Sequence, residues 1–307
     1  MNDISFGKFD FSKYRDNLVV TDPKIAELYT IFGDNVFLLP CGEDSKSFQH
    51  VEALCSWFLS KNLDKNGTVV AIGGGSVGDT VGFATSIYKR GVSVLHVPTT
   101  LIAQVDSSIG GKTAVNLCGV KNAVGSYHFG ATLIDVDFLN TLDEAQMLSG
   151  YGEIIKYAML DANVAKVLAC GNGKLDDLIA ACVNCKKRIC ELDPYCKGAR
   201  NKLNFGHTIG HALELSLGIS HGVAVANGIY YETLLSTKLG RCNQAYFDEW
   251  GGKITQKFKI YPLTKEILAL TLHDKKNADS KVGFVLPNKF DEVLLSLDEI
   301  EGLLLDA

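Results

Sequence analysis

Short apolar, β-branched runs alternate with amphipathic stretches up to about residue 140. Such runs predict strands, and apolar residues spaced three and four apart predict helices. The expected strands are Leu18–Thr21, Val36–Leu39, Thr68–Ile72, Val92–Val97 and Thr132–Val136, and the expected helices are Lys24–Tyr29, Phe48–Ser60 and Val77–Tyr88. This alternation predicts an α/β fold with a mostly parallel sheet, whose ligands bind at the carboxyl ends of the strands.

From about Asp143 the pattern changes to a helical period with few strand-like runs. The expected helices are Val164–Ala169, Leu175–Arg188, Leu203–Leu217 and Val223–Leu239, and one late run, Val282–Leu286, has the pattern of a strand. A chain of 307 residues is long enough for two cores. The sequence therefore predicts an α/β domain over residues 1–142 and an α-helical domain over residues 143–307.

Composition narrows the class of protein. Apolar residues make up 47% of the chain and charged residues 21%, which is typical of a globular protein. The net charge of −5 offers no general attraction to nucleic acid or anionic membranes, but it permits a local cationic pocket. No apolar run reaches the length of a membrane span, no leader-like segment opens the chain, and nine scattered cysteines suit a reducing compartment. We expect a cytoplasmic protein with neither nucleic acid nor membrane as partner.

A glycine-rich loop follows the expected strand Thr68–Ile72. Residues Gly73 to Asp79 (GGGSVGD) open the next helix, so backbone N–H groups and a helix N-terminus face one point, which favours phosphate binding. The loop also satisfies G-x-G-x-x-G, but residues 95–102 lack the acid that a common dinucleotide fold places about 20 residues on. The alternative is a tight turn that simply requires small residues.

Residues 97–116 combine hydroxyls and glycines with a single acid, Asp106, and a single base, Lys112. Gly110 and Gly111 allow close approach of backbone to a ligand, and Lys112 offers a point charge to phosphate. Lys121 and Asn122 continue the same chemistry. Each lysine taken singly would be an ordinary surface charge, so the segment indicates a site only as a group.

Three histidines fall within 15 residues in a chain that has seven. His207 and His211 are four apart and share one helix face, and His221 follows, which together favour a metal site over satisfied structural histidines. Spacing alone does not choose the ligands. A carboxylate from Glu153 or Glu214 would complete a site with an open position.

Four cysteines lie between residues 182 and 196. Their spacing matches no common iron–sulfur or zinc motif, and Cys182, Cys185 and Cys190 lie on an expected helix, where cysteine behaves as a small apolar residue. We therefore expect no metal cluster there.

Several segments together resemble the 3-dehydroquinate synthase family in their order and spacing, from about Cys41 to residues 274–276 (DKK). They are GGGSVGD (73–79), RGVSVLHVPTTLIAQVDSSIGGKTAVN (90–116), GVKNAVGSYH (119–128), GYGEIIKY (150–157), KKRICELDPYCKGARNKLNFGHTIGHALE (186–214) and HGVAVANG (221–228). The resemblance implies an N-terminal α/β NAD-binding domain, a C-terminal α-helical metal domain, a cleft between them and a homodimer.

The resemblance also assigns residues. It implies Glu153, His207 and His221 as ligands of zinc, with cobalt as an alternative, and it makes His211 an outer neighbour or a phosphate ligand. NAD contacts would come from Gly42, Glu43, Lys46, Gly75, Ser76, Val77, Gly78, Asp79, Thr99, Thr100, Lys112, Lys121, Phe138, Leu139, Asn140 and Thr141.

For the substrate, the family implies three groups of contacts. The carboxylate would be held by Lys186 and Arg200. The phosphate would be held by Lys112, Asn122, His211 and one of Lys275 or Lys276, with Arg90 reaching over from the neighbouring subunit. The ring hydroxyls would face Asp106, Lys156 and Asn204.

The implied reaction converts 3-deoxy-D-arabino-heptulosonate 7-phosphate to 3-dehydroquinate in the shikimate pathway. A carbon is oxidised transiently by NAD, phosphate leaves by β-elimination, the hydride returns, and an aldol step closes the ring, so NAD is unchanged overall. The substrate phosphate acts as base in the elimination, and no protein group is the sole general base.

The chain departs from the family pattern in four places. Val223 replaces the usual Glu beside His221, Asp143 to Met147 replace a Pro-x-Arg-Glu segment, Cys41 stands where Asp is common, and the N-terminal part is short. The rival functions are a metal-dependent polyol or glycerol dehydrogenase, a related cyclase that makes inosose or valiolone rings, and a pseudoenzyme that binds NAD and a partner without turnover.

Overall fold

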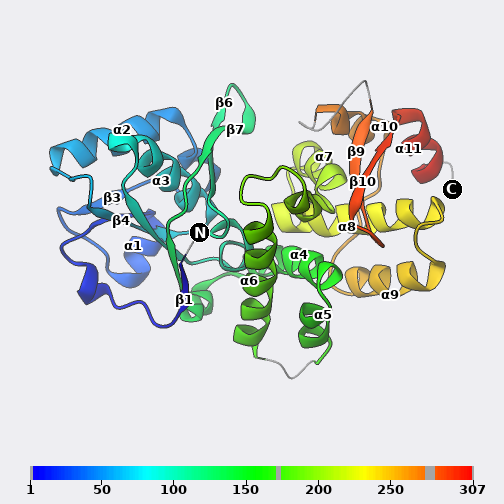
Figure 1. Ribbon diagram of the computed structural model, residues 1–307, viewed down its shortest axis with the longest axis horizontal. Coiled ribbons are helices and arrows are strands. Elements are labelled where there is room, and N and C mark those ends of the chain that lie inside the picture. Colours follow the sequence, from blue (N-terminus) through cyan, green and yellow to red (C-terminus); the bar gives the residue numbers. More distant parts are fainter. Residues whose placement is uncertain (1–2, 171–173, 274–280, 306–307) are drawn as a thin grey trace. The chain divides into compact units, whose positions relative to one another are not determined.

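The computed structural model describes residues 3–170, 174–273 and 281–305, and it divides into two compact units, Met1–Met147 and Leu148–Ala307. Figure 1 shows the α/β unit in blue to green and the helical unit in green to red. The described helices all lack the combination of length and hydropathy that crossing a bilayer requires.

The first unit is built on a sheet of six strands that all run parallel. Their order is β1 (Ile4–Phe6), β8 (Ala131–Ile134), β5 (Ser93–Pro98), β4 (Thr68–Gly73), β2 (Leu18–Thr21) and β3 (Val36–Leu38). β4 lies at the centre of this order and pairs with β5 in a register that sets Gly73 opposite Pro98. The ends of β4 and β5 therefore present the glycine loop and the segment after Pro98 side by side.

Alternate residues of β4 feed two separate cores. Val69 and Ala71 pack in the core cluster that contains helices α2 (Phe48–Ser60) and α3 (Gly75–Ile87), whereas Val70 and Ile72 pack in the cluster beneath α1 (Pro23–Tyr29) and the 3-10 turns η1 (Phe11–Tyr14) and η5 (Val136–Thr141). Successive side chains of a strand point to opposite faces, so a strand covered on both sides must be apolar throughout. The prediction of an α/β fold with a parallel sheet is confirmed.

The five strands and three helices expected in this unit are present, with bounds shifted by no more than two residues. The structure adds the edge strand β1 and an antiparallel hairpin of β6 (Lys112–Leu117) and β7 (Val120–Tyr127). No strand was expected in this hairpin. Its strands contain several polar residues and are mostly exposed or half-buried, which weakens the period-two signal on which strand prediction depends.

The second unit is mostly helical. Its helices are α4 (Glu144–Leu160, from Leu148 onward), α5 (Ala162–Ala169), α6 (Leu175–Leu192), α7 (His207–Leu217), α8 (His221–Lys238), α9 (Gln244–Thr255), α10 (Lys265–Leu270) and α11 (Leu297–Leu304), with 3-10 turns η6 (Ala199–Asn204) and η7 (Thr271–His273). The expected strand Val282–Leu286 is present as β9 and pairs with β10 (Asp291–Leu295), which was not expected. β9 is buried throughout because it lies in the core between helices of this unit.

Helix α7 begins later than its sequence pattern predicts. The expected helix started at Leu203, but Gly206 adopts a φ of +80° and separates η6 from α7, which starts at His207. A left-handed residue interrupts a helix, and glycine adopts this conformation without steric cost. The histidine therefore occupies the first turn of its helix and not the interior.

Candidate functional site

The glycine loop joins β4 to α3. Gly74 is the N-cap of α3 and contributes no side-chain cap among the described residues, so the first N–H groups of the helix remain available to a ligand. A Cβ on Gly73 would lie 2.7 Å from Val77, and one on Gly75 would lie 2.9 Å from Ser107 Oγ. The glycines thus satisfy both interpretations: they are required by packing, and they leave the backbone exposed for a phosphate.

A hollow lies against this loop. It is lined by Gly73 to Gly75, Gly78 and Asp79, by the end of β5 from His96 to Pro98, and by Ser107 and Lys112. The base Lys112 and the helix N-terminus of α3 therefore border the same space, and both favour an anion there.

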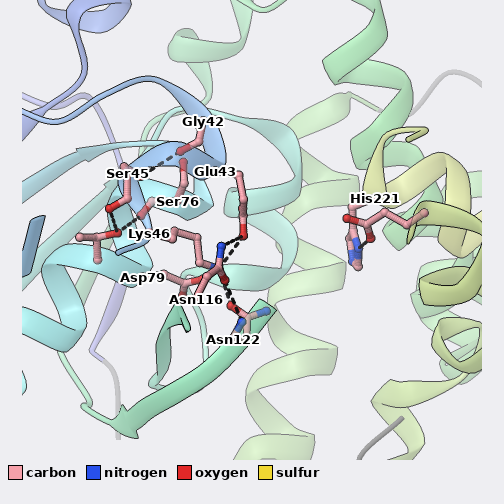
Figure 2. Close-up of polar contacts among 11 residues, drawn as sticks. Gly42, Glu43, Ser45, Lys46, Ser76, Asp79, Asn116, Asn122 and His221 are labelled. Atoms are coloured by element: carbon pink, nitrogen blue, oxygen red, sulfur yellow. Dashed lines mark hydrogen bonds and ion pairs between the residues drawn. The ribbon is translucent and has the colours of Figure 1, made fainter. Parts of the chain in front are cut away.

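A polar network lies beside the helix start, as Figure 2 shows. Lys46 is only 6% exposed, donates to Asp79 Oδ2 at 2.7 Å and to Asn122, and lies 3.8 Å from Glu43 Oε1. Asn116 donates to Glu43 at 2.8 Å and accepts from the backbone of Asn122 at 2.8 Å. Four residues that the sequence nominated separately are therefore joined, and the linking Asn116 had been given no role. Its only sequence signal is its place at the end of the segment 97–116.

Other nominated residues of this unit have identifiable structural neighbours. Thr99 donates its backbone N–H to Gly73 O at 3.0 Å, and a Cβ on Gly74 would lie 3.2 Å from Thr100. Asp106 lies in the π-helical turn η4 (Ala103–Ser107), which borders the hollow. Gly42 begins the 3-10 turn η2 (Gly42–Ser45), and Lys121 is exposed on β7.

The turn η5 is divided between the core and the surface. Phe138 and Leu139 are buried, Asn140 is exposed, and Thr141 contacts the Tyr29 hydroxyl at 3.2 Å. Phe138 packs edge-on against the same tyrosine. Phe138 and Leu139 therefore support the sheet, whereas the side chains of Asn140 and Thr141 remain accessible.

Arg90 is exposed in a strained turn. Lys89, Arg90 and Gly91 all have positive φ values of 47°, 64° and 112°. Lys89 Nζ donates to Leu63 O at 2.6 Å, which holds the turn in place. Such conformations persist in non-glycine residues only where the surroundings fix them.

In the second unit, one carboxylate and two imidazoles converge. Glu153 of α4 is fully buried, and its Oε1 lies 3.5 Å from His207 Nε2 and 3.4 Å from His221 Nε2. These ligand atoms all lie within 4.8 Å of one another. His207 is the first residue of α7, His221 is the first residue of α8, and Glu153 lies in the middle of α4. Three helices therefore supply one cluster. His211 lies beside it, with its ring centroid 5.3 Å from that of His207.

The Nδ1 atoms of both imidazoles already have hydrogen-bond partners. His207 Nδ1 lies 3.1 Å from Phe205 O, and His221 Nδ1 lies 2.8 Å from Glu214 Oε2. These bonds orient the rings so that both Nε2 atoms face Glu153, as outer neighbours do around metal sites. Glu214 therefore contacts His221 from outside the cluster, and it supplies that imidazole with a carboxylate partner, which Val223 cannot do.

Neighbouring charges shift the pKa values of the residues in this cluster. Burial of Glu153 would raise its pKa, but Lys156, which forms an ion pair with it, and the two imidazoles hold that pKa well below its usual range. Burial opposes protonation of His221, but hydrogen bonds to Glu153 and Glu214 outweigh it and raise the pKa to about 9. The carboxylates thus favour positive charge at this imidazole, and a metal ion bound there would take the place of the proton.

Glycines bring the three helices together. A Cβ on Gly152 would lie 1.9 Å from Gly222 O, and one on Gly222 would lie 1.7 Å from Ser149 O. Both distances are shorter than any real contact, so only glycine permits α4 and α8 to touch here. Glu153 directly follows Gly152 in the sequence, and His221 directly precedes Gly222. Their convergence therefore depends on backbone contact between the helices.

The nominated substrate cations of this unit are buried. Lys156, Lys186 and Arg200 are 1%, 6% and 3% exposed. Arg200 Nη1 donates to Pro194 O at 3.0 Å. Asn204 Nδ2 is buried without a hydrogen-bond partner among the described residues, which leaves it a donor for a ligand. Lys275 and Lys276 lie outside the described residues.

The residues present fit both implied cofactors. Two imidazole nitrogens and a carboxylate oxygen, each imidazole fixed by an outer acceptor, are the donor set that zinc and cobalt accept with one position open. The glycine loop leaves backbone N–H groups at a helix N-terminus, and the Lys46 network lies beside it, which suits the pyrophosphate of a dinucleotide.

Comparison with known proteins places the fold and the family. A family model for the N-terminal part of 3-dehydroquinate synthase matches residues 36–149, and one for the C-terminal part matches residues 150–277. The 3-dehydroquinate synthase of Dictyoglomus turgidum is 37% identical, covering 95% of this chain and 87% of the relative. That of a Thermoanaerobacter species is 39% identical, covering 93% and 88%.

Solved structures share the architecture. A 2-deoxy-scyllo-inosose synthase bound to carbaglucose-6-phosphate, NAD+ and Co2+ superposes with a TM-score of 0.81 at 23% identity, covering 99% of this chain and 96% of that one. A 2-epi-5-epi-valiolone synthase from Streptomyces hygroscopicus with NAD+ and Zn2+ gives 0.82 at 23%, covering 100% and 96%. A glycerol dehydrogenase from Schizosaccharomyces pombe gives 0.66 at 12%, covering 99% and 88%.

The chain has the class of fold seen in these two synthases, which combines an α/β unit with a helical unit. Within that class, the two family models together match more than half of the chain and the curated relatives exceed 30% identity over most of it. The chain belongs to the 3-dehydroquinate synthase family, and the resemblance of its motifs to that family is confirmed.

Proposed function

We propose that the chain converts 3-deoxy-D-arabino-heptulosonate 7-phosphate to 3-dehydroquinate and phosphate, with NAD and Zn2+ or Co2+ as cofactors, in the cytoplasm. The observation that carries the proposal is the convergence of Glu153, His207 and His221 in a chain 37% identical to a 3-dehydroquinate synthase. Residues 1–142 would bind NAD, and residues 143–307 would bind the metal and hold the substrate.

The NAD site would be built from the glycine loop and its polar neighbours. Gly42, Glu43 and Lys46 would contact the adenosine side, and the backbone from Gly75 to Asp79 would bind the pyrophosphate. The ion pair between Lys46 and Asp79 supports this assignment, because an unpaired aspartate would repel the pyrophosphate. Further contacts would come from Thr99, Thr100, Lys112, Lys121, Phe138, Leu139, Asn140 and Thr141.

The metal would be held by Glu153, His207 and His221. A metal held there would supply a Lewis acid for the oxygen on the reacting carbon, and NAD would supply a reversible hydride acceptor. Phe205 O and Glu214 would keep both imidazoles oriented while substrate enters and product leaves. Lys156 forms an ion pair with Glu153 and would also face a substrate hydroxyl. Its positive charge would then stabilise both the Glu153 carboxylate and negative charge on that substrate oxygen.

The chain's own side chains would bind the two anionic groups of the substrate. Lys186 and Arg200 would hold the carboxylate, and their burial strengthens a charge-assisted bond because little water competes. The phosphate would be held by Lys112, Asn122, His211, one of Lys275 or Lys276, and Arg90 of a second copy in a homodimer.

Hydroxyl contacts and the proton transfer complete the proposal. Asp106 and Asn204 would face ring hydroxyls, and the unpartnered amide of Asn204 is suited to donate to one of them. The departing phosphate would remove the proton in the elimination, so the protein must hold that phosphate in place and need not supply the base.

A coupled assay tests the proposal. Purified protein would receive NAD, Zn2+ and the heptulosonate phosphate, and phosphate release would be followed together with absorbance of NADH. We expect one phosphate per 3-dehydroquinate with only trace NADH. Accumulation of NADH in proportion to product would support a dehydrogenase, and binding of NAD without phosphate release would support a pseudoenzyme.

A further inference from the structure

The first turn of α7 has no side-chain cap of its own. Its N-cap residue is Gly206, which offers no side chain, and its next residue, His207, belongs to the metal cluster. The first N–H groups of any helix lack partners within the helix and must find acceptors elsewhere when buried. The acceptor here comes from another helix.

Glu232 of α8 supplies that acceptor. Its Oε2 accepts from Gly206 N at 2.6 Å and its Oε1 accepts from Ile209 N at 3.2 Å, and the side chain is fully buried. The two bonded N–H groups lie on either side of His207 in the sequence. A single carboxylate thus holds the backbone on both sides of this histidine.

Close packing of the two helices explains why the cap comes from α8. A Cβ on Gly228 would lie 1.9 Å from Gly206 O, and a Cβ on Gly206 would lie 2.4 Å from the side chain of Ile229. No larger residue at position 206 could therefore cap the helix. Gly228 and Glu232 are four residues apart and share one face of α8. Gly228 permits the close approach of α7 to α8, and Glu232 accepts the hydrogen bonds that no side chain of α7 accepts.

We propose that Glu232 is a positioning residue for the metal site. It fixes the start of α7, and with the Phe205 carbonyl on His207 Nδ1 it directs His207 Nε2 towards Glu153. Helix α8 then contributes twice, once through His221 at its first residue and once through Glu232 three turns later. This inference rests on the proposed function, because it assumes that the cluster binds a metal.

The test measures zinc affinity and not turnover. Glu232→Gln keeps the shape of the side chain but replaces one acceptor oxygen by a donor, so one of the two backbone bonds is lost. We expect the Kd for Zn2+, from competition with a chromogenic chelator, to rise about 10- to 100-fold. The absorption spectrum of the Co2+ protein should change as well, because the geometry of a ligand changes.

The control is Glu299→Ala. Glu299 Oε2 accepts from Ser296 N at 2.8 Å in a capping box at the start of α11, outside the cluster, so the substitution removes a side-chain-to-backbone bond at another helix start. We expect this variant to lower the melting temperature without changing the Kd for Zn2+ by more than about twofold. If Glu232→Gln lowers stability but leaves both zinc affinity and the Co2+ spectrum unchanged, the positioning role is refuted.

A double-mutant cycle with His207→Ala shows whether Glu232 acts through this histidine. We expect Glu232→Gln to cause no further loss of residual affinity in the His207→Ala background. An equal loss in both backgrounds would overturn the proposal. Should Glu232→Gln fail to fold, Glu232→Asp retains the charge with a shorter reach and should show an intermediate Kd; an unchanged Kd would again count against it. Wild-type protein that binds no Zn2+ would instead refute the proposed function.

Discussion

The two units build their candidate sites by different means. In the α/β unit, a phosphate cradle is made of consecutive backbone N–H groups where β4 meets α3, and it depends on a few glycines close together in the sequence. In the helical unit, Glu153, His207 and His221 come from three helices and meet only because glycines let the helices touch. The first site is local in the sequence, whereas the second exists only when the tertiary packing is correct.

The largest expected effect separates the two sites directly. Replacing His207 by Ala removes a ligand from the helical unit and leaves the glycine loop untouched. We expect loss of bound zinc and a fall in kcat of roughly a thousandfold or more, with NAD affinity within about twofold of wild type. Metal analysis, phosphate release and calorimetric titration of NAD check these values. Full activity in this variant would refute the ligand assignment.

Packing of the helical unit can be broken without touching a ligand. Gly222→Ala would force a Cβ to 1.7 Å from Ser149 O, so α4 and α8 must separate. We expect a loss of about 3 kcal/mol or more in the free energy of unfolding, together with reduced zinc binding. Gly252→Ala in α9 is the control, because a Cβ there meets nothing within 4 Å and should stabilise the helix by up to about 1 kcal/mol. Similar urea midpoints for the two variants would contradict the account.

Acid should weaken the α/β unit through His96. This residue is 6% exposed and lines the hollow; burial, with a smaller effect of His128, lowers its pKa from 6.5 to about 4. The unfolded chain therefore binds the proton first as pH falls, so the stability from the neutral ring is complete above pH 6.5 and is lost towards pH 4.

The variant His96→Gln isolates this contribution. We expect the wild type to lose on the order of 2 kcal/mol more than His96→Gln between pH 7.5 and pH 5, as measured by urea unfolding. Parallel losses in the two proteins would show that the ring does not titrate as its burial requires.

The smallest expected effect concerns the polar network. Lys46→Met leaves Asp79 without its ion-pair partner, and we expect NAD affinity to fall about tenfold while zinc content stays unchanged. Lys8→Met removes an exposed pair with Asp137 and should change neither quantity. If wild type, Lys46→Met and Lys8→Met bind NAD with equal affinity, the polar network around Lys46 plays no part in cofactor binding.

The difference between the two units also explains what sequence reasoning could reach. The glycine loop was found because strand, glycines and helix are contiguous, and the parallel sheet was predicted from the alternation of strands and helices along the chain. The histidines were found as a group by their spacing, but that spacing left Glu153 and Glu214 as equal partners, and the choice of ligands came from resemblance to the family.

Other features had no local signal. Gly206 delays the start of the expected helix because its backbone is left-handed, and Glu232 has the pattern of an ordinary helix residue until its contact with the start of α7 is seen. Asn116 acquires meaning only when the hairpin folds back beside Glu43. Each of these roles depends on a partner distant in the sequence.

A zinc anomalous difference map tests the central claim most directly, using crystals grown with Zn2+ and NAD. The account predicts one strong peak about 2.0–2.2 Å from Glu153 Oε1, His207 Nε2 and His221 Nε2. A peak elsewhere, with these three side chains directed to different places, would contradict it.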